Sequence, residues 1–141
     1  MKIATWNLNS LKVRLPHLLD WLAANQPDAV CLQELKCENK AFPLADIEAA
    51  GYHAVFNGQK TYNGVAILSK KPLSEVSYDI PGFADEQKRI VAGTLDGVRL
   101  VCGYFPNGQA VGSDKFAYKL DWLAALTAWL RERMRPRPSG P

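Results

Sequence analysis

Apolar and polar positions alternate along the chain in short runs that predict an α/β fold. Apolar runs of strand length occupy residues 3–6, 29–32 and 65–69, and each ends at polar or turn-forming residues. Between the first two runs, leucine recurs at helical spacing from Leu15 to Leu22. This strand, helix, strand order predicts two parallel strands joined by a right-handed crossover.

The first helix is predicted over residues 10–25, and Pro27 ends it. Pro16 is compatible with this helix only if it falls in the first turn, because an interior proline removes a backbone hydrogen bond. A last, long helix is predicted over residues 115–134. Its predicted core-facing stripe consists of Phe116, Leu120, Leu123, Thr127, Leu130 and Met134.

A hairpin is predicted between these helices. Residues 89–95 and 98–104 are two apolar runs joined by Asp96-Gly97, a dipeptide typical of two-residue hairpin turns. Residues 74–80 alternate weakly and indicate an edge strand. We therefore predict the fold class α/β, with a mixed sheet that includes the hairpin and is flanked by helices.

Size and composition restrict the protein class only loosely. The 141 residues suit one domain, and the net charge of +3 permits a nucleic-acid or phosphate partner without requiring one. No N-terminal signal or membrane-length apolar run is visible, so we expect no membrane association. Cys31 and Cys102 lie in apolar runs and are predicted to be buried thiols, with Cys37 exposed; this usage favours the reducing cytoplasm.

Candidate chemistry lies where the two parallel strands end. Asn7 follows the first strand and Glu34 follows the second, so both should emerge at the carboxyl edge of one sheet. A carboxylate beside an amide oxygen suits a hard divalent cation such as Mg²⁺. Strand ends also carry polar residues that only form caps and turns, so this pair alone does not identify a function.

Four sequence blocks together resemble the exonuclease III family, the abasic-site endonucleases of the endonuclease/exonuclease/phosphatase superfamily. They are Trp-Asn-Leu-Asn-Ser at 6–10, Leu-Gln-Glu-Leu-Lys at 32–36, Tyr-Asn-Gly-Val-Ala-Ile-Leu-Ser at 62–69 and Gly-Tyr-Phe-Pro-Asn-Gly at 103–108. The blocks occur in family order and at family-like spacing, and the resemblance extends to about Arg131. It implies that residues 1–134 are one half of a four-layer α/β sandwich. Residues 135–141 are rich in arginine and proline and contain no core residue, so we expect a disordered Arg/Pro tail. A basic arm for a phosphate backbone is the other interpretation of this tail.

The resemblance implies a DNA-repair phosphodiesterase that depends on Mg²⁺, with Mn²⁺ as a substitute. The expected activities are 3′-5′ exonuclease and abasic-site endonuclease, and the expected partner is double-stranded DNA with abasic sites or 3′ ends. A divalent metal would stabilise the charge that develops on the phosphoryl and leaving oxygens. A branch acting on phosphoinositides or sphingomyelin is the other option within the superfamily, and the blocks at 62–69 and 103–108 favour DNA repair.

The resemblance also assigns roles to individual residues. Glu34 is similar to the metal-ligating glutamate, and Asn7 to the asparagine beside the metal and the scissile phosphate. Asn9 takes the place of a polar residue that supports the metal site, and Tyr104 resembles the catalytic tyrosine near the attacked phosphate. The residues expected to contact DNA are Asn107, Lys36, Tyr62, Asn63 and Arg89.

Simpler structural roles remain open for several of these residues. Tyr104 also fits a strand-end aromatic that fills the core, and Asn107 fits an ordinary turn. Lys36 and Arg89 fit solvated surface charges as well as they fit DNA contacts.

The family pattern continues beyond what this chain contains. The family is about twice as long, and its Gly-Asp-x-Asn block, a later aspartate and a terminal Asp-His pair are absent; His17 and His53 match none of them. We therefore expect a truncated member. One alternative is an inactive fragment or weak DNA-binding remnant. A half-sandwich would also leave a sheet face uncovered, through which a homodimer could form.

Overall fold

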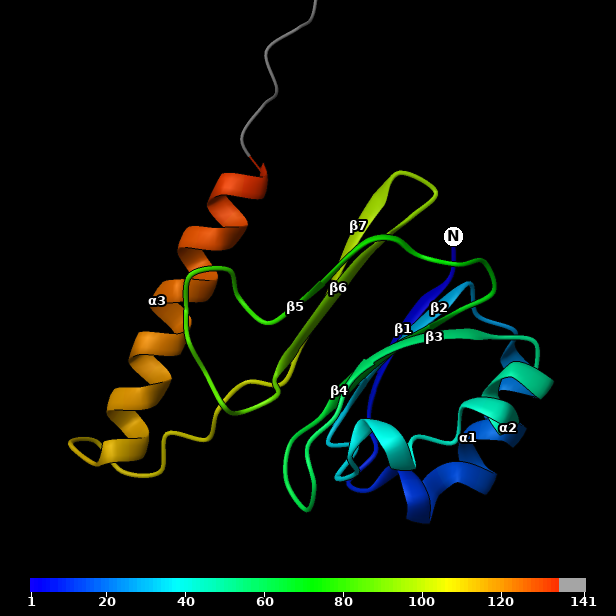
Figure 1. The fold of residues 1–141 in the computed structure, drawn as a ribbon, viewed down its shortest axis with the longest axis horizontal. Coiled ribbons are helices and arrows are strands. Elements are labelled where there is room, and N and C mark those ends of the chain that lie inside the picture. The colour runs from blue at the N-terminus through cyan, green and yellow to red at the C-terminus, as the bar shows by residue number, and fades with distance from the viewer. Residues whose placement is uncertain (135–141) are drawn as a thin grey trace, which may run out of the picture. The chain divides into compact units, whose positions relative to one another are not determined.

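The structure, a computed structural model, describes residues 1–134; the predicted tail at 135–141 lies outside the described residues. The chain divides into two compact units. Figure 1 shows the helices and strands of the chain, coloured from the N-terminus to the C-terminus. The first unit contains Met1–Asp79 and Asp85–Tyr104, and the second contains Ile80–Ala84 and the chain from Phe105 onward.

The first unit holds every described strand. Its elements, in chain order, are β1 (Ile3–Asn7), α1 (Leu11–Asn25), β2 (Ala29–Gln33), the 3-10 helix η1 (Asn39–Ala41), α2 (Leu44–Ala49), β3 (His53–Asn57), β4 (Val65–Ser69), β5 (Ser74–Tyr78), β6 (Ile90–Leu95) and β7 (Val98–Gly103). The described part of the second unit contains one helix, α3 (Asp114–Met134).

A four-stranded mixed sheet with strand order β1-β2-β4-β3 forms the centre of the first unit. β1 and β2 are parallel, whereas β4 runs antiparallel to both β2 and β3. β4 is buried along its whole length because its alternating side chains enter two different cores. Ala66 and Leu68 join the core with α1 and α2, while Val65 and Ile67 enter the second core.

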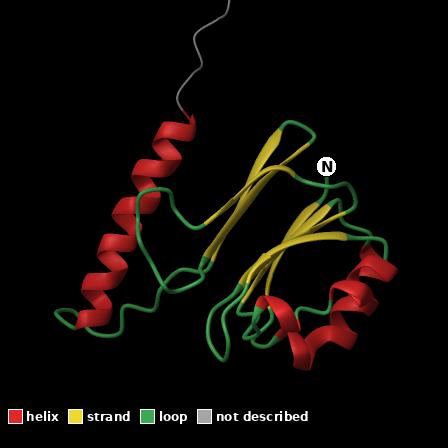
Figure 2. Ribbon diagram, in the orientation of Figure 1, coloured by secondary structure: helices red, strands yellow, loops and turns green. Residues whose placement is uncertain are grey.

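The second core lies between this sheet and a three-stranded antiparallel sheet, β5-β6-β7 (Figure 2). The predicted hairpin turn is confirmed, because Asp96 and Gly97 have φ values of 48° and 81° and join Leu95 directly to Val98. β5 is an edge strand, as its weak alternation predicted. Its register shifts between Ser74 and Ser77.

The predicted α/β class with a mixed sheet is confirmed, but the hairpin's place in that sheet is wrong. β6 pairs with both β5 and β7, and the hairpin packs face to face on the first sheet through Val91, Leu95, Leu100 and Cys102. One face of the four-stranded sheet is therefore covered by helices and the other by the chain's own second sheet. The expected uncovered face of that sheet does not exist, so the argument for a homodimer through it fails.

Helix α1 begins one residue later than predicted, after Ser10, whose hydroxyl oxygen accepts a hydrogen bond from the Val13 amide at 3.4 Å. Pro16 is the sixth residue of this helix and lies inside it. The expectation that this helix tolerates Pro16 only in its first turn is therefore wrong. The apolar face built from Leu11, Leu18 and Leu22 holds the helix on the sheet despite the proline.

The stripe predicted for α3 is also wrong. Its buried residues are Trp122 and Leu126, whereas Leu120 and Met134 are exposed. Within the second unit Trp122 packs edge-on against Phe105, with ring centroids 5.0 Å apart. The larger indole surface, rather than the leucine spacing, decides which face of this helix is buried.

Two further expectations concern cysteine burial and membranes. Cys102 is buried, and Cys31 and Cys37 are half-buried. The prediction of an exposed Cys37 is wrong, because Cys37 packs against the core beside α1 and α2. Within residues 1–134, no helix combines the length and apolar character needed to cross a membrane.

Candidate active site

Asn7 and Glu34 lie in contact at the carboxyl edge of the two parallel strands. Asn7 ends β1 and pairs in register with Gln33, the last residue of β2, and Glu34 follows immediately. The Asn7 Nδ2 donates a hydrogen bond to Glu34 Oε1 at 2.9 Å. Parallel pairing of two apolar runs therefore brings together two polar side chains that are 27 residues apart.

Three further residues complete a polar cluster around Glu34. The Tyr104 hydroxyl lies close enough to the Glu34 carboxylate to lower the pKa of that group. Lys36 Nζ lies 3.7 Å from Glu34 Oε2 and donates to Asn9 Oδ1 at 2.5 Å. The Asn9 amide in turn donates to Asn7 Oδ1 at 3.1 Å, which fixes the Asn7 side-chain amide. The structure thus joins residues from the ends of β1, β2 and β7.

The charges of this cluster are set by burial and hydrogen bonding. Burial alone would raise the pKa of Glu34, but hydrogen bonds from Asn7 and Tyr104 and the Lys36 ammonium outweigh it and hold the pKa below its usual range. Burial and the neighbouring Glu34 carboxylate raise the pKa of Tyr104, with Arg89 opposing them. At neutral pH the carboxylate is charged and the phenol remains a hydrogen-bond donor.

Several residues of the cluster have a left-handed backbone. Asn9, Glu34 and Lys36 have φ values of 48°, 55° and 55°. This conformation costs a non-glycine residue roughly 1–2 kcal/mol, and such strain concentrates at functional sites. Hydrogen bonds to the start of α1 hold the segment, because the Ser10 amide donates to Glu34 O at 2.9 Å and the Leu11 amide to Leu35 O at 2.9 Å.

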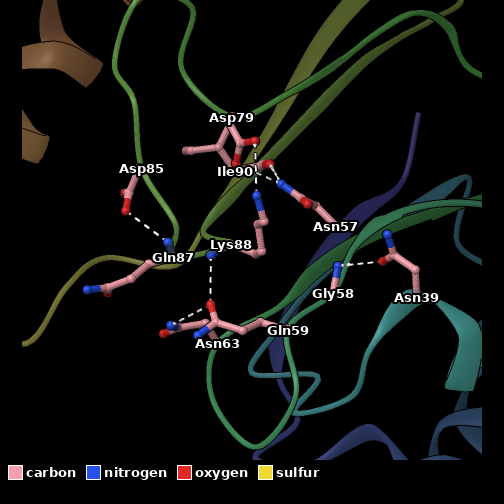
Figure 3. Close-up of polar contacts among 10 residues, drawn as sticks. All are labelled: Asn39, Asn57, Gly58, Gln59, Asn63, Asp79, Asp85, Gln87, Lys88 and Ile90. Atoms are coloured by element: carbon pink, nitrogen blue, oxygen red, sulfur yellow. Dashed lines mark hydrogen bonds and ion pairs between the residues drawn. The ribbon is translucent and has the colours of Figure 1, made fainter.

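The loop before β4 packs directly against the Glu34 segment. The Lys36 amide donates to Asn63 O at 2.9 Å, and Gly64 accepts from Leu35 at 3.1 Å. The Tyr62 side chain is 67% exposed, so it is accessible to a partner. The Asn63 side chain is only 9% exposed, and its Nδ2 donates to Gln59 Oε1 at 3.0 Å (Figure 3).

Gln59 and Asn57 connect this loop to the start of β6. Gln59 Oε1 also accepts from the Lys88 amide at 2.9 Å (Figure 3). Asn57 Nδ2 donates to Asp79 Oδ1 at 2.8 Å and to Ile90 O at 3.0 Å. Sequence reasoning assigned no role to Asn57 or Gln59.

Arg89 and Asn107 differ in unit and in exposure, since Arg89 is buried and Asn107 is exposed. Arg89 belongs to the first unit, is 9% exposed, and packs its guanidinium 5.0 Å from the centroid of the Tyr104 ring. Asn107 belongs to the second unit, where its Oδ1 accepts a hydrogen bond from the Gln109 amide at 2.9 Å. The roles of both residues in DNA binding stay predictions.

The donor set of the cluster fits magnesium. Glu34 and Asn7 offer oxygen donors only, and Mg²⁺ in proteins uses one or two carboxylates together with waters and substrate phosphates. Among residues 1–134, no group of three or more His, Cys, Asp and Glu side chains is placed to hold a metal.

Comparison with known proteins places these features in a family. A family model described as "Endonuclease/Exonuclease/phosphatase family" matches residues 4–139. Exodeoxyribonuclease III from Haemophilus influenzae is 35% identical over 139 residues, which cover 94% of this chain and 52% of that protein. The DNA repair nuclease APEX1 from Danio rerio is 34% identical, with 92% of this chain and 44% of that protein covered.

Solved structures of nucleases also superpose closely on this chain. A 3′-5′ exonuclease from Neisseria meningitidis superposes with a TM-score of 0.93 at 49% identity, covering 95% of this chain and 53% of that one. An AP endonuclease from Archaeoglobus fulgidus gives 0.92 at 39% identity, covering 96% and 52%. A related 3′ phosphatase from Neisseria was solved with a product DNA hairpin. The chain spans about half the length of the relatives it matches.

Proposed function

The chain belongs to the endonuclease/exonuclease/phosphatase family, and we propose that it serves as a DNA-repair phosphodiesterase of the exodeoxyribonuclease III type. The resemblance drawn from the four sequence blocks is confirmed at the family level. The observation that carries the proposal is the Glu34 carboxylate, held by Asn7 at the edge of the two parallel strands. The proposed substrate is double-stranded DNA with abasic sites or 3′ ends.

The residues of the cluster divide the proposed chemistry among them. Glu34 and Asn7 would hold Mg²⁺ or Mn²⁺, which when bound stabilises charge on the phosphoryl and leaving oxygens. Asn9 orients the Asn7 amide through its backbone N–H. The protonated Tyr104 hydroxyl is a donor that can shift from Glu34 to a phosphate oxygen, adding preorganised stabilisation.

Three of the other predicted residues would bind the DNA backbone. Lys36 and the exposed Tyr62 come from adjoining segments and are proposed to contact phosphates and sugar. Asn107 is proposed to contact a phosphate from the second unit. The buried side-chain amide of Asn63 supports the loop that carries Tyr62, which makes an indirect contribution the simpler proposal for it. The free thiols among the described residues suit the reducing cytoplasm, which we propose as the compartment.

The direct test is cleavage of a duplex oligonucleotide with one abasic site, in Mg²⁺ and then in EDTA. We expect cutting that needs the metal and falls at least about 100-fold in Glu34→Ala, because charge stabilisation at the phosphate is lost. Glu38→Ala is the matched control, since Glu38 forms an exposed ion pair with Lys40 and its loss should leave cutting unchanged. Equal cutting by wild type and Glu34→Ala would identify a contaminating enzyme and contradict the proposal.

A second candidate is an inactive fragment or weak DNA-binding remnant. It is favoured by one observation, that the chain spans about half the length of its relatives. Under this alternative, folded protein would bind abasic duplex weakly, with strong salt dependence, and would not cut it. Fluorescence anisotropy with the same labelled oligonucleotide measures the binding. Binding without cutting would identify the remnant, and cutting would identify the nuclease.

A further inference from the structure

Arg89 is a buried charge with an unusually specific set of partners. Its Nε and Nη2 both donate to Gln87 Oε1, at 3.0 and 2.8 Å, and its Nη1 donates to the Tyr104 carbonyl at 3.1 Å. Arginine is rarely buried unless its donors are satisfied. These three bonds fix the plane of the guanidinium group, since its donors form a rigid fork.

The hairpin register explains why Arg89 meets Tyr104. Ile90 pairs with Gly103 at the end of the β6–β7 ladder, and the Tyr104 amide extends the ladder by donating to Arg89 O at 2.9 Å. Directly opposite residues project to the same side of a sheet. The guanidinium therefore lies 5.0 Å from the centroid of the Tyr104 ring, in a cation–π contact.

Gln87 is the outer support of this arrangement. Its side-chain carbonyl receives two N–H groups of Arg89, while its own backbone amide donates to Asp85 Oδ1 at 2.9 Å (Figure 3). The Lys88 backbone between Gln87 and Arg89 is bound on both sides, by Gln59 Oε1 and by the Gly64 amide. The segment that presents Arg89 to Tyr104 is thus held at each residue.

We propose that Gln87 and Arg89 are positioning residues that hold the Tyr104 phenol against Glu34. In this role Arg89 acts on Tyr104 within the protein rather than on the DNA backbone. The positioning itself depends on the contacts of Arg89 with Gln87 and Tyr104. Its effect on catalysis rests on the proposed function of Tyr104.

Fluorine NMR tests the positioning without DNA, metal or activity. The protein's five tyrosines are labelled as 3-fluorotyrosine, and the Tyr104 resonance is assigned by its loss in Tyr104→Phe. We expect the Tyr104 resonance to shift in Gln87→Leu and in Arg89→Gln while the other resonances stay in place. In Gln87→Glu the Tyr104 resonance should stay at its wild-type position, because a carboxylate can accept both N–H groups of Arg89. Arg14→Gln, an exposed arginine on α1, is the charge-matched control.

Salt-dependent binding of an abasic duplex tests where Arg89 acts. Removing a phosphate-contacting arginine lowers the slope of log affinity against log salt by about 1. We expect Arg89→Gln to leave this slope unchanged. Where cleavage is measurable, Gln87→Leu should lower kcat about tenfold with little change in KM, as misorientation of a catalytic group does.

The outcomes separate cleanly. An unmoved Tyr104 resonance in both variants, or a slope reduced by about 1 in Arg89→Gln, overturns the proposal. A Tyr104 shift in Gln87→Leu, rescued by Gln87→Glu, supports it even if Arg89→Gln fails to fold. A chain that bound no abasic duplex would count against the proposed function, while the fluorine spectra would still decide the positioning role.

Discussion

Single residues at the candidate site hold a costly backbone conformation. Glu34 has a φ of 55°, which glycine adopts freely and which other residues adopt at a cost. We predict that Glu34→Gly is more stable than Glu34→Ala by about 1 kcal/mol, after glycine's greater freedom in the unfolded chain is counted. Because neither variant keeps the carboxylate, their difference isolates the backbone.

Urea denaturation in EDTA measures this difference. The matched control is the same pair of substitutions at Glu38, whose φ is −69° and whose backbone any residue adopts. There alanine should be at least as stable as glycine. An alanine variant at Glu34 that matched or exceeded the glycine variant would show that the left-handed conformation is not maintained in solution.

Asp28 links the end of the first crossover to the start of β1, and its contribution should depend on pH. A hydrogen bond from the Lys2 amide at 2.6 Å lowers the pKa of Asp28 below its ordinary value of 3.8. A lowered folded-state pKa means that the stabilisation is complete above the unfolded-state value and is lost as pH falls through the folded-state value. Asp28→Asn should therefore destabilise the protein near neutral pH, with the difference shrinking below pH 3.8. Urea midpoints across this range decide it; a constant difference would contradict the assignment.

The sequence predicted the position of some site residues better than their partners. Asn7 and Glu34 could be placed because each ends an apolar run, and parallel strands bring such ends together. The contact between Arg89 and Tyr104 follows from counting outward from the Asp96-Gly97 turn, a step that was available in the sequence. The support from Gln87 could not be predicted, because it depends on a side-chain conformation chosen by packing.

At the scale of elements, α1 carries a proline that its tertiary packing tolerates. Pro16 has no N–H to donate to the carbonyl of Lys12, four residues earlier. We predict that Pro16→Ala stabilises the protein by about 1–3 kcal/mol, by restoring this bond and removing the steric conflict. Pro27→Ala is the control, expected to give no gain because Pro27 lies beyond the helix end. Thermal denaturation by circular dichroism compares them, and an unchanged or lower Tm for Pro16→Ala would refute the account.

Local patterns identified the strands but not their grouping into sheets. The runs at β1, β2 and β4 and the turn at Asp96-Gly97 are encoded over a few residues each. Whether the hairpin joins β4 or pairs with β5 depends on contacts between segments far apart in the chain. β5 was the weakest strand signal, and its pairing with β6 creates the second sheet. Sheet membership is therefore a property of the packed molecule rather than of any one run.

At the scale of the whole molecule, the first unit is held together by two apolar cores on opposite faces of one sheet. Ile67 on β4 is fully buried between the two sheets, whereas Ile3 on the edge strand β1 is 44% exposed. If the sheets pack as described when this chain stands alone, Ile67→Ala should lower the free energy of unfolding by about 2–5 kcal/mol. Ile3→Ala makes the same chemical change at an exposed edge and should stay within about 1 kcal/mol of wild type. Denaturant titrations of both variants measure the two costs. Equal, small losses would mean that the second sheet does not cover the first in solution, and the support that β6 and β7 give to Arg89 and Tyr104 would then be lost as well.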